Sequence, residues 1–125
     1  MKALSIRADY AWQILIGEKT SEYRSWPTKH RGDLLICSTA QRIAGTIPGH
    51  ALCVVQIVDC IKLGPNSYEW KIGDGGFYIR PFPVKGKQRL FNIEDDLIVF
   101  DPITNETDEA KTDAWVRKYI DPLII

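Results

Sequence analysis

The stretch ALCVVQIVDCIKL, residues 51–63, is a long apolar run that is rich in Val and Ile. β-branched residues favour extended strands, and a run with so few polar positions is typical of a strand buried in a sheet. Gly64-Pro65-Asn66 follows directly and has the composition of a turn. We therefore predict residues 51–63 to form the central strand of a small β-barrel.

Shorter elements precede this central strand. Residues 2–6 alternate between apolar and polar side chains and predict a strand, whereas the apolar positions of residues 8–15 recur at the spacing of one helical face. Gly17 follows the last apolar position and is typical of a helix end, because glycine readily adopts the left-handed conformation. The alternation of residues 21–26 and the apolar run of residues 34–39 predict two further strands.

The segment after the central strand is aromatic and rich in glycine. Residues 68–72 and 77–82 have the composition of strands, and we predict that Gly73-Asp74-Gly75-Gly76 joins them as a tight hairpin turn. Pro81 and Pro83 lack a backbone N–H and are expected outside a central strand position. Many short strands with few helices indicate a fold that is mainly β with flanking helices (α+β), and they favour a barrel.

Charge is distributed unevenly along a chain whose net charge is zero. Residues 1–93 contain 13 Lys and Arg against 7 Asp and Glu, whereas residues 94–125 contain 3 against 9. We predict one β-barrel domain over residues 1–93 and an acidic C-terminal extension over residues 94–125, packed on the same domain. The extension is expected to contain a strand near residues 97–100 and a helix from about Asp108 to Tyr119. The charge asymmetry is consistent with a solvated acidic tail or with a basic face kept for phosphates.

Composition excludes several classes of protein. The chain is 45% hydrophobic and 26% charged, and no apolar run approaches the roughly 20 residues that span a bilayer, so we expect a soluble protein without membrane contact. The first residues lack the apolar stretch of a secretory signal, which favours the cytoplasm. Cys37, Cys53 and Cys60 have neither CxxC spacing nor a neighbouring pair of histidines, so we predict free thiols, no metal site and no cofactor.

The loop after the predicted helix carries a distinctive pattern. Residues 17–24, GEKTSEYR, fit the GxKxxExR signature of ASCH domains, at the same place between the first helix and the second strand. Residues 24–26, 31–36 and 79–88 also look like bacterial ASCH proteins, in the same order. The chain therefore resembles the ASCH domain family of the PUA-like superfamily over about residues 1–93, and the resemblance implies a PUA-like small β-barrel.

The resemblance implies a ligand and candidate catalytic residues. PUA-like barrels bind RNA, and the ASCH cleft is thought to hold RNA or a modified nucleoside; some members act as ribonucleases or as amidohydrolases on N4-acetylcytidine. Lys19 matches the catalytic lysine of the amidohydrolase type, while Glu22 stands at the position of its threonine. The family's His and Ser after the third strand are Cys37 and Thr39 here. Lys19, Glu22 and Thr39 are therefore the candidate catalytic residues.

The residues of the signature also suggest chemistry in themselves. A lysine held among apolar walls can bind phosphate or, once deprotonated, act as a base or nucleophile; the alternative for Lys19 is a solvated or helix-capping role. Glu22, Arg24 and Trp26 alternate on one predicted strand and should share a face. Glu22 and Arg24 either pair with each other and fix the geometry, or divide the task, with Arg24 on a phosphate and Glu22 on a proton or a base edge.

Aromatic and basic residues complete the predicted ligand site. Single-stranded RNA is commonly bound by stacking its bases on aromatic rings between basic groups, and we expect Trp26 or Trp70 to face a ligand. Lys85, Lys87 and Arg89 alternate after a proline-stiffened loop. They can set three cations along one edge of the cleft, or they can lie on a solvated edge strand. The predicted ligand-binding residues are Arg24, Trp26, Trp70, Lys85, Lys87 and Gln88.

Three functions are open at this point. The leading hypothesis is an RNA- or nucleotide-binding ASCH domain protein with a basic, aromatic-lined cleft, whose partner is RNA or a modified nucleoside or nucleotide. The first alternative is an RNA-directed hydrolase, either a metal-independent ribonuclease or an N4-acetylcytidine-type amidohydrolase, that uses Lys19 and Glu22. The second alternative is a protein-interaction module whose basic cleft binds an acidic tail.

Overall fold

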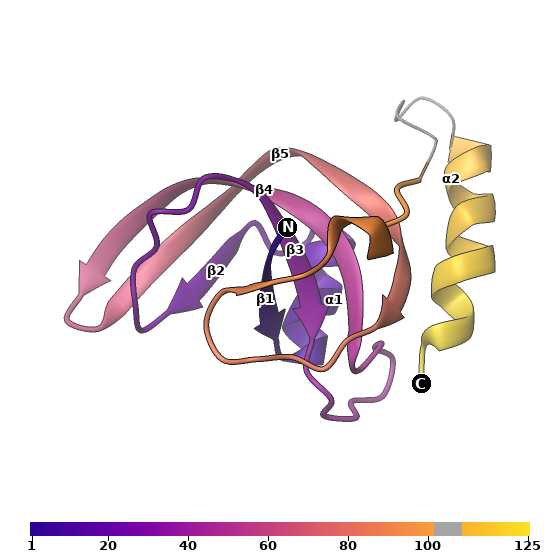
Figure 1. The fold of residues 1–125 in the computed structure, drawn as a ribbon, viewed down its shortest axis with the longest axis horizontal. Helices are drawn as coiled ribbons and strands as arrows, with labels where there is room; N and C mark the ends of the chain where they lie inside the picture. Colours follow the sequence, from indigo (N-terminus) through magenta and orange to yellow (C-terminus); the bar gives the residue numbers. More distant parts are fainter. Residues whose placement is uncertain (102–108) are drawn as a thin grey trace.

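The computed structural model describes residues 1–101 and 109–125. Within these residues six strands form one sheet, and two helices pack on it (Figure 1). The strands are β1 (Lys2–Ile6), β2 (Ser21–Arg24), β3 (Gly32–Ser38), β4 (His50–Gly64), β5 (Ser67–Pro83) and β6 (Phe91–Asn92). The helices are α1 (Ala8–Leu15) and α2 (Glu109–Trp115), and α2 continues through a π-helical segment (Val116–Ile120) into a 3-10 turn (Asp121–Leu123). A further 3-10 turn spans Asp95–Leu97.

The described strands form a mixed sheet in the order β2-β5-β4-β3-β1-β6. β1 and β3 run parallel, whereas the other neighbouring strands are antiparallel, and β4 and β5 form a long hairpin (Figure 1). The fold is thus mainly β with flanking helices, as the sequence predicted. The described strands do not close into the predicted barrel, because the short strands β2 and β6 lie at opposite ends of the sheet.

One contact brings the segment after β6 back to β5. The backbone N–H of Arg80 donates to the Val99 carbonyl at 2.8 Å, and the N–H of Asp101 donates to the Tyr78 carbonyl at 3.0 Å. This contact is an isolated bridge and not a ladder of hydrogen bonds. The strand predicted near residues 97–100 is therefore not formed as such.

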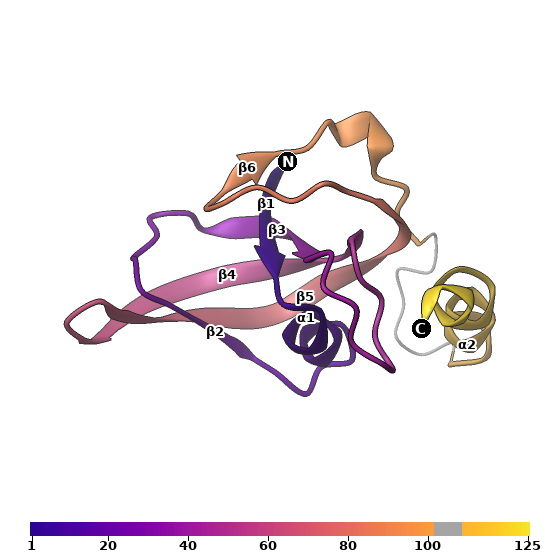
Figure 2. The ribbon, with the colours of Figure 1, turned by 90° about the horizontal axis from the view of Figure 1, so that it is seen from below.

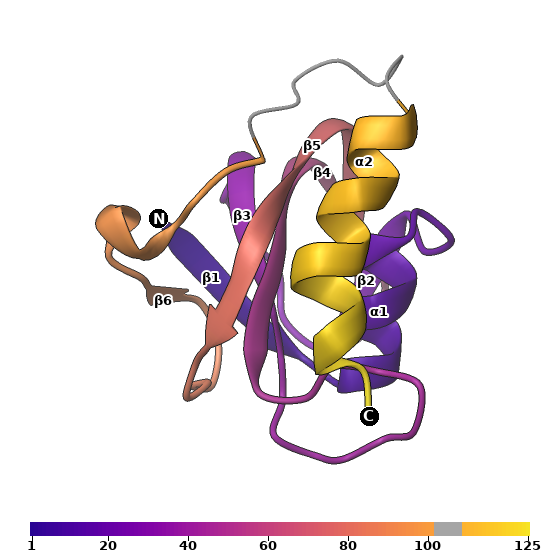
Figure 3. The ribbon, with the colours of Figure 1, turned by 90° about the vertical axis from the view of Figure 1, so that its right-hand side faces the viewer.

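Alternation along β3 divides the core between the two faces of the sheet. Leu34 and Ile36 belong to the cluster that α1 and the C-terminal helical segment cover, while Leu35 and Cys37 belong to a second cluster. Figure 2 and Figure 3 show α1 and α2 on one side of the sheet, and the segments that lead into and out of the edge strand β6 on the other. All four residues are buried because both faces are covered, which explains the uninterrupted apolar run at this point of the sequence.

Several predicted elements are confirmed. Residues 51–63 lie in β4, which is flanked by β3 and β5 near the centre of the sheet, and α1 spans the predicted residues 8–15. Gly17 has φ 81°, the left-handed conformation expected where the helix ends. Pro81 and Pro83 lie in β5 beyond the stretch that pairs with β2, so neither proline sits between two of the named strands.

The hairpin predicted at residues 73–76 is wrong. β5 runs without a break over Ser67–Pro83, and the turn at Gly64-Pro65-Asn66 joins it to β4. Residues 73–76 form an irregular part of β5, where the register with β4 shifts between Val54 and Gln56. Clustered glycines tolerate a bulge as readily as a turn, so their composition alone does not distinguish the two.

The C-terminal helical segment packs on the sheet. Ile120 is 1% exposed and belongs to the core cluster that contains residues of α1. The predicted helix is present from Glu109, while its expected first residue, Asp108, lies outside the described residues. In the described part of the chain, no helix has the length and apolar character needed to cross a membrane. The division of the chain after residue 93 stays a prediction.

Candidate functional site

A pocket of about 460 Å³ lies where the end of β1, the start of α1, the α1–β2 loop and β2 meet. Its volume falls within the range of small-molecule sites, roughly 300–1,000 Å³. Lys19, Glu22 and Arg24 line it, so the three charged positions of the signature meet in one concave site. The other lining residues are Ile6, Arg7, Tyr10 and Tyr23.

The loop between α1 and β2 places Lys19 in the wall of this pocket. After the turn at Gly17, the Lys19 N–H donates to the Gln13 carbonyl at 3.0 Å. The Lys19 side chain is only 16% exposed, and its Nζ lies 3.6 Å from Glu22 Oε1. The ammonium is thus held inside the pocket by a carboxylate three residues further along the chain.

Two tyrosine rings flank the same ammonium. Lys19 Nζ lies 5.1 Å from the ring centroid of Tyr10 and 5.1 Å from that of Tyr23. Each contact is within cation–π range and is typically worth about 0.5–1 kcal/mol at an exposed site. Both tyrosines are themselves exposed, so they offer aromatic surface to a ligand as well as to Lys19.

Glu22 is the buried carboxylate of the pocket. It is 6% exposed, and its Oε1 accepts the Tyr23 backbone N–H at 2.9 Å in addition to its contact with Lys19. Its Oε2 is buried and has no hydrogen-bond partner among the described residues. Buried polar atoms are rarely left unpaired, so a group that donates a hydrogen bond to this oxygen would be favoured here.

Arg24 contacts β1 and not Glu22, which is the partner that one interpretation of the sequence gave it. Its Nη2 donates to the Ser5 carbonyl at 2.8 Å. The Nε of the same guanidinium is buried and unpartnered within residues 1–101 and 109–125. Glu22 pairs with Lys19 instead, so the two functional groups of β2 have separate partners.

The lining of the pocket is positively charged. Arg7, Lys19 and Arg24 line it together with a single carboxylate, Glu22. Arg7 is partly neutralised by Asp9, whose Oδ1 lies 3.0 Å from the Arg7 Nε. The remaining excess of cations favours a ligand that carries negative charge.

Trp70 is a core residue and does not face a ligand. It is 0% exposed, and its indole N–H donates to the Trp26 carbonyl at 3.2 Å. The rings of Trp26 and Trp70 pack edge to face, with their centroids 4.7 Å apart. This placement corrects the expectation for Trp70: it lies opposite the buried Glu22 in the β2–β5 register, where its ring fills the core.

Three other predicted ligand-binding residues lie outside the lining of the pocket. Lys85, Lys87 and Gln88 are exposed on the loop that follows β5, and they are not among the residues that line the pocket. Gly86 in the same loop packs so closely on β1 that a Cβ at this position would collide with the Ser5 hydroxyl oxygen. The loop is therefore adjacent to β1, although its cations lie outside the lining.

Trp26 and Thr39 also lie outside the lining. Trp26 is half-buried beyond the end of β2, and the Cζ of Arg89 lies 5.2 Å from its ring centroid. The Thr39 N–H donates to the carbonyl of Ile6, a lining residue, at 2.9 Å. Thr39 is thus next to the pocket without being part of it.

Sequence reasoning missed Arg7, Tyr10 and Tyr23 as pocket residues. Tyr10 lies on the exposed side of α1, away from the apolar positions that predicted the helix, and Tyr23 is the exposed residue beside Glu22 on β2. For the two tyrosines, the one available signal was an aromatic residue in or near the signature. That signal carries little weight alone, because single exposed apolar residues are common on protein surfaces.

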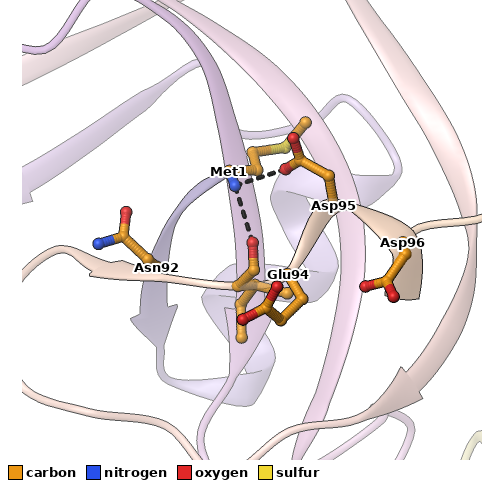
Figure 4. Close-up of a pocket in the computed structure, with 6 residues that line it drawn as sticks. Met1, Asn92, Glu94, Asp95 and Asp96 are labelled. Carbon is orange, nitrogen blue, oxygen red and sulfur yellow. Dashed lines mark hydrogen bonds and ion pairs between the residues drawn. The ribbon is translucent and has the colours of Figure 1, made fainter.

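A second pocket, of about 490 Å³, lies at the other end of β1 (Figure 4). The Met1 ammonium donates to the Ile93 carbonyl at 2.8 Å and lies 2.6 Å from Asp95 Oδ1. Glu94 and Asp96 add carboxylates to the lining, so this pocket has the opposite charge to the first. None of the predicted ligand-binding residues lines it. Among the described residues, no group of three or more His, Cys, Asp or Glu is arranged to hold a metal ion.

The pocket around Lys19 is built from the part of the chain that defines its family. Residues 4–78 match the family model of the ASCH domain. Because the match covers more than half of the chain, the chain belongs to the ASCH domain family. ASCH domains are PUA-like domains and often bind RNA. A search of curated proteins found no match.

Proposed function

We propose that the chain binds RNA and that the pocket around Lys19 receives one nucleotide unit of the strand. The observation that carries the proposal is the meeting of Lys19, Glu22 and Arg24 in a positively charged pocket of about 460 Å³. A pocket of this size suits a single nucleotide, and its charge favours a phosphate. Membership of a family that often binds RNA supports the same conclusion.

The lining residues divide the proposed task by their chemistry. Arg24 and Lys19 are the groups that would meet the phosphate, the first through directed N–H donors and the second as a compact charge. The exposed rings of Tyr10 and Tyr23 would stack on the base. Glu22 would orient Lys19 through their contact of 3.6 Å.

Cations outside the pocket extend the proposed interface. Lys85 and Lys87 are exposed on the loop that touches β1, and Gln88 is exposed beside them. Phosphates that these groups neutralise release counterions, so the logarithm of the RNA affinity should fall by about 0.7 per contact for each tenfold rise in salt. Salt-insensitive binding would contradict a polymeric ligand.

The predicted cytoplasmic location stays a prediction.

Titration of a fluorescent single-stranded RNA pentamer into the full chain tests the proposal. Lys19→Ala and Arg24→Ala are each expected to weaken binding about 10-fold or more, because each removes a charged contact. Lys62→Ala is the matched control and should change the affinity less than about 2-fold, since Lys62 is an exposed lysine of β4 outside the pocket lining. Equal affinity for wild type and all three variants, compared as folded protein, would overturn the proposal.

A hydrolase that acts on RNA or on a modified nucleoside is the second candidate. It is favoured by the distance of 3.6 Å between Lys19 Nζ and Glu22 Oε1, because the pair places an amine and a carboxylate, the groups that general acid–base and nucleophilic catalysis use, in one site. Thr39, next to Ile6, stays the predicted third group. Incubation with RNA and with N4-acetylcytidine, followed by mass spectrometry of the products, tests this candidate. Products that disappear in Lys19→Arg support it, and the absence of product from both substrates contradicts it.

A further inference from the structure

We infer that Arg89 and Trp26 form a second subsite, beside the pocket, for the nucleotide next to the bound one in single-stranded RNA. The inference rests on the proposed function and extends it, because it requires a ligand of at least two consecutive nucleotides. Its basis is a cation–aromatic stack in which the Arg89 Cζ lies 5.2 Å from the Trp26 ring centroid. The stack lies outside the pocket that Lys19 lines.

Trp26 is a fixed ring at the surface of the core. Its ring packs edge to face on the fully buried Trp70, with centroids 4.7 Å apart. Its backbone carbonyl accepts the Trp70 indole N–H at 3.2 Å. A half-buried ring held in this way is preorganised, so a ligand that uses the stack loses little of its binding energy to ordering the protein.

The backbone of Arg89 is in a conformation that residues other than glycine seldom adopt. Its φ is 61°, in the left-handed region, and the residue is exposed. Such sparsely populated conformations cluster at ligand-binding sites. A guanidinium that lies over a ring and is still exposed has surface left for a base and for a phosphate.

The stack is linked to the pocket through Arg24 and Ser5. Trp26 is two residues beyond Arg24, which lines the pocket and donates to the Ser5 carbonyl at 2.8 Å. Gly86, three residues before Arg89, packs against the same Ser5 so closely that a Cβ would collide with its hydroxyl oxygen. The loop that carries Arg89 therefore contacts Ser5, which Arg24 also contacts, and Trp26, which is two residues from Arg24.

The loop that carries Arg89 is basic. Residues 84–93, which include this loop, contain three Lys and Arg and no Asp or Glu. Lys85 and Lys87 in this segment are exposed on the loop itself. A strand that leaves the pocket in this direction meets positive charge along its phosphates, which favours a nucleic acid over an uncharged partner.

Single-stranded RNA suits both parts of this surface. Its unpaired bases stack on aromatic rings and on the planes of Arg guanidinium groups. A mononucleotide uses only the pocket, whereas a dinucleotide uses the pocket and the stack together. The competing role for Arg89 is structural, in which the guanidinium only fixes the loop on Trp26.

Calorimetric titration of the 5′-phosphorylated adenylates pA and pApA separates these two roles. Wild type is expected to bind pApA about 10-fold more tightly than pA, the gain typical of one stacked base. In Arg89→Ala this gain should fall below about 3-fold, while the affinity for pA stays within about 2-fold of wild type. Arg89→Gly adopts the left-handed backbone without strain and should behave in the same way. Arg42→Ala is the control, an exposed arginine after β3 that should leave both affinities unchanged.

The outcomes distinguish this inference from the proposed function. Equal affinity of wild type for pA and pApA would overturn the second subsite alone. An equal loss of affinity for both probes in Arg89→Ala and Arg89→Gly would also overturn it, because Arg89 would then act only on the structure of the site. Failure of wild type to bind pA, pApA or a longer RNA would overturn the proposed function, and the second subsite with it.

Discussion

Arg24 on β2 donates a hydrogen bond of 2.8 Å to the carbonyl oxygen of Ser5 on β1, although three strands separate β2 from β1 in the sheet. The side chain thus connects two strands that share no backbone hydrogen bonds. The sheet between them is curved (Figure 1). The same guanidinium lines the pocket. One residue therefore contributes both to the fold and to the proposed ligand site.

Arg24→Ala should lower the free energy of unfolding by about 1.5–3 kcal/mol, the usual cost of losing a hydrogen bond to a charged group. Arg24→Lys should recover part of this loss, because an ammonium can still donate to the Ser5 carbonyl. Urea unfolding followed by circular dichroism measures both. Arg42→Ala, at an exposed position, is the control and should stay within about 0.5 kcal/mol of wild type. An Arg24→Ala variant as stable as this control would show that the link between β2 and β1 is unimportant.

Trp70→Ala should lower the free energy of unfolding by about 3–5 kcal/mol, because it leaves a cavity in place of a fully buried indole. Trp70→Phe keeps an aromatic ring and should cost less. Since Trp70 has no exposed surface and does not line the pocket around Lys19, folded Trp70→Phe should bind the mononucleotide pA with the affinity of wild type. A folded Trp70→Phe variant whose affinity for pA is lowered while its stability is unchanged would show that Trp70 belongs to the ligand site.

The buried thiols make stability depend on alkaline pH. Burial raises the pKa of Cys37 from 9.0 to about 12 and also raises the pKa of Cys53 from 9.0 to about 12. Between these values the folded thiols keep their protons while the unfolded thiols lose theirs. The stability that the two thiols contribute is therefore fully present below pH 9.0 and is lost as the pH rises toward about 12. Over this window the free energy of unfolding falls by at most about 1.4 kcal/mol per pH unit for each thiol.

Urea unfolding of wild type and Cys37→Ala at a series of alkaline pH values checks this dependence. Cys37→Ala removes one titrating thiol, so the decline of its stability above pH 9.0 should be less steep than that of wild type. Parallel declines would mean that the Cys37 thiol ionises equally in the folded and unfolded chains.

Removal of residues 109–125 should destabilise the chain severely, because Ile120 is 1% exposed and Trp115 packs against the same core cluster. Ile120→Ala alone should lower the free energy of unfolding by about 2–5 kcal/mol. Arg117→Ala, at an exposed position of the same helical segment, is the matched control. Thermal unfolding followed by circular dichroism compares the three. A truncated chain that unfolds at the wild-type temperature and binds RNA more tightly would identify the extension as an acidic competitor and not as part of the core.

The features that depend on local sequence were predictable. Residues 8–15 carry the helical spacing of α1, and Gly17 allows the turn that ends it. The continuity of β5 through residues 73–76 was not predictable, because it depends on pairing with β4, a contact between distant parts of the chain. The open sheet was not predictable for a similar reason. The alternation of residues 21–26 indicated a strand up to Trp26 and did not show that β2 ends at Arg24.

The candidate site was predictable to the extent that it is continuous in sequence. Lys19, Glu22 and Arg24 belong to one signature, and the structure places all three in one pocket. Tyr10 enters the site because α1 brings its ring within 5.1 Å of Lys19 Nζ, and no pattern in the sequence encodes that approach. Trp70 was predicted to face a ligand because an indole ring can stack on a base. Its burial follows from strand pairing, which the sequence does not show.

Chemical-shift mapping of the full chain with a short single-stranded RNA tests the central claim, that the pocket around Lys19 is the RNA site, most directly. The amide of Tyr23 is a natural reporter, because its N–H is bonded to Glu22 Oε1 at 2.9 Å. We expect the largest saturable shifts at Tyr23, Lys19 and Arg24, and we expect those of Tyr23 and Arg24 to need about 10-fold more RNA to saturate in Lys19→Ala. Saturable shifts centred elsewhere, or an RNA titration that leaves these three amides unmoved, would contradict the account.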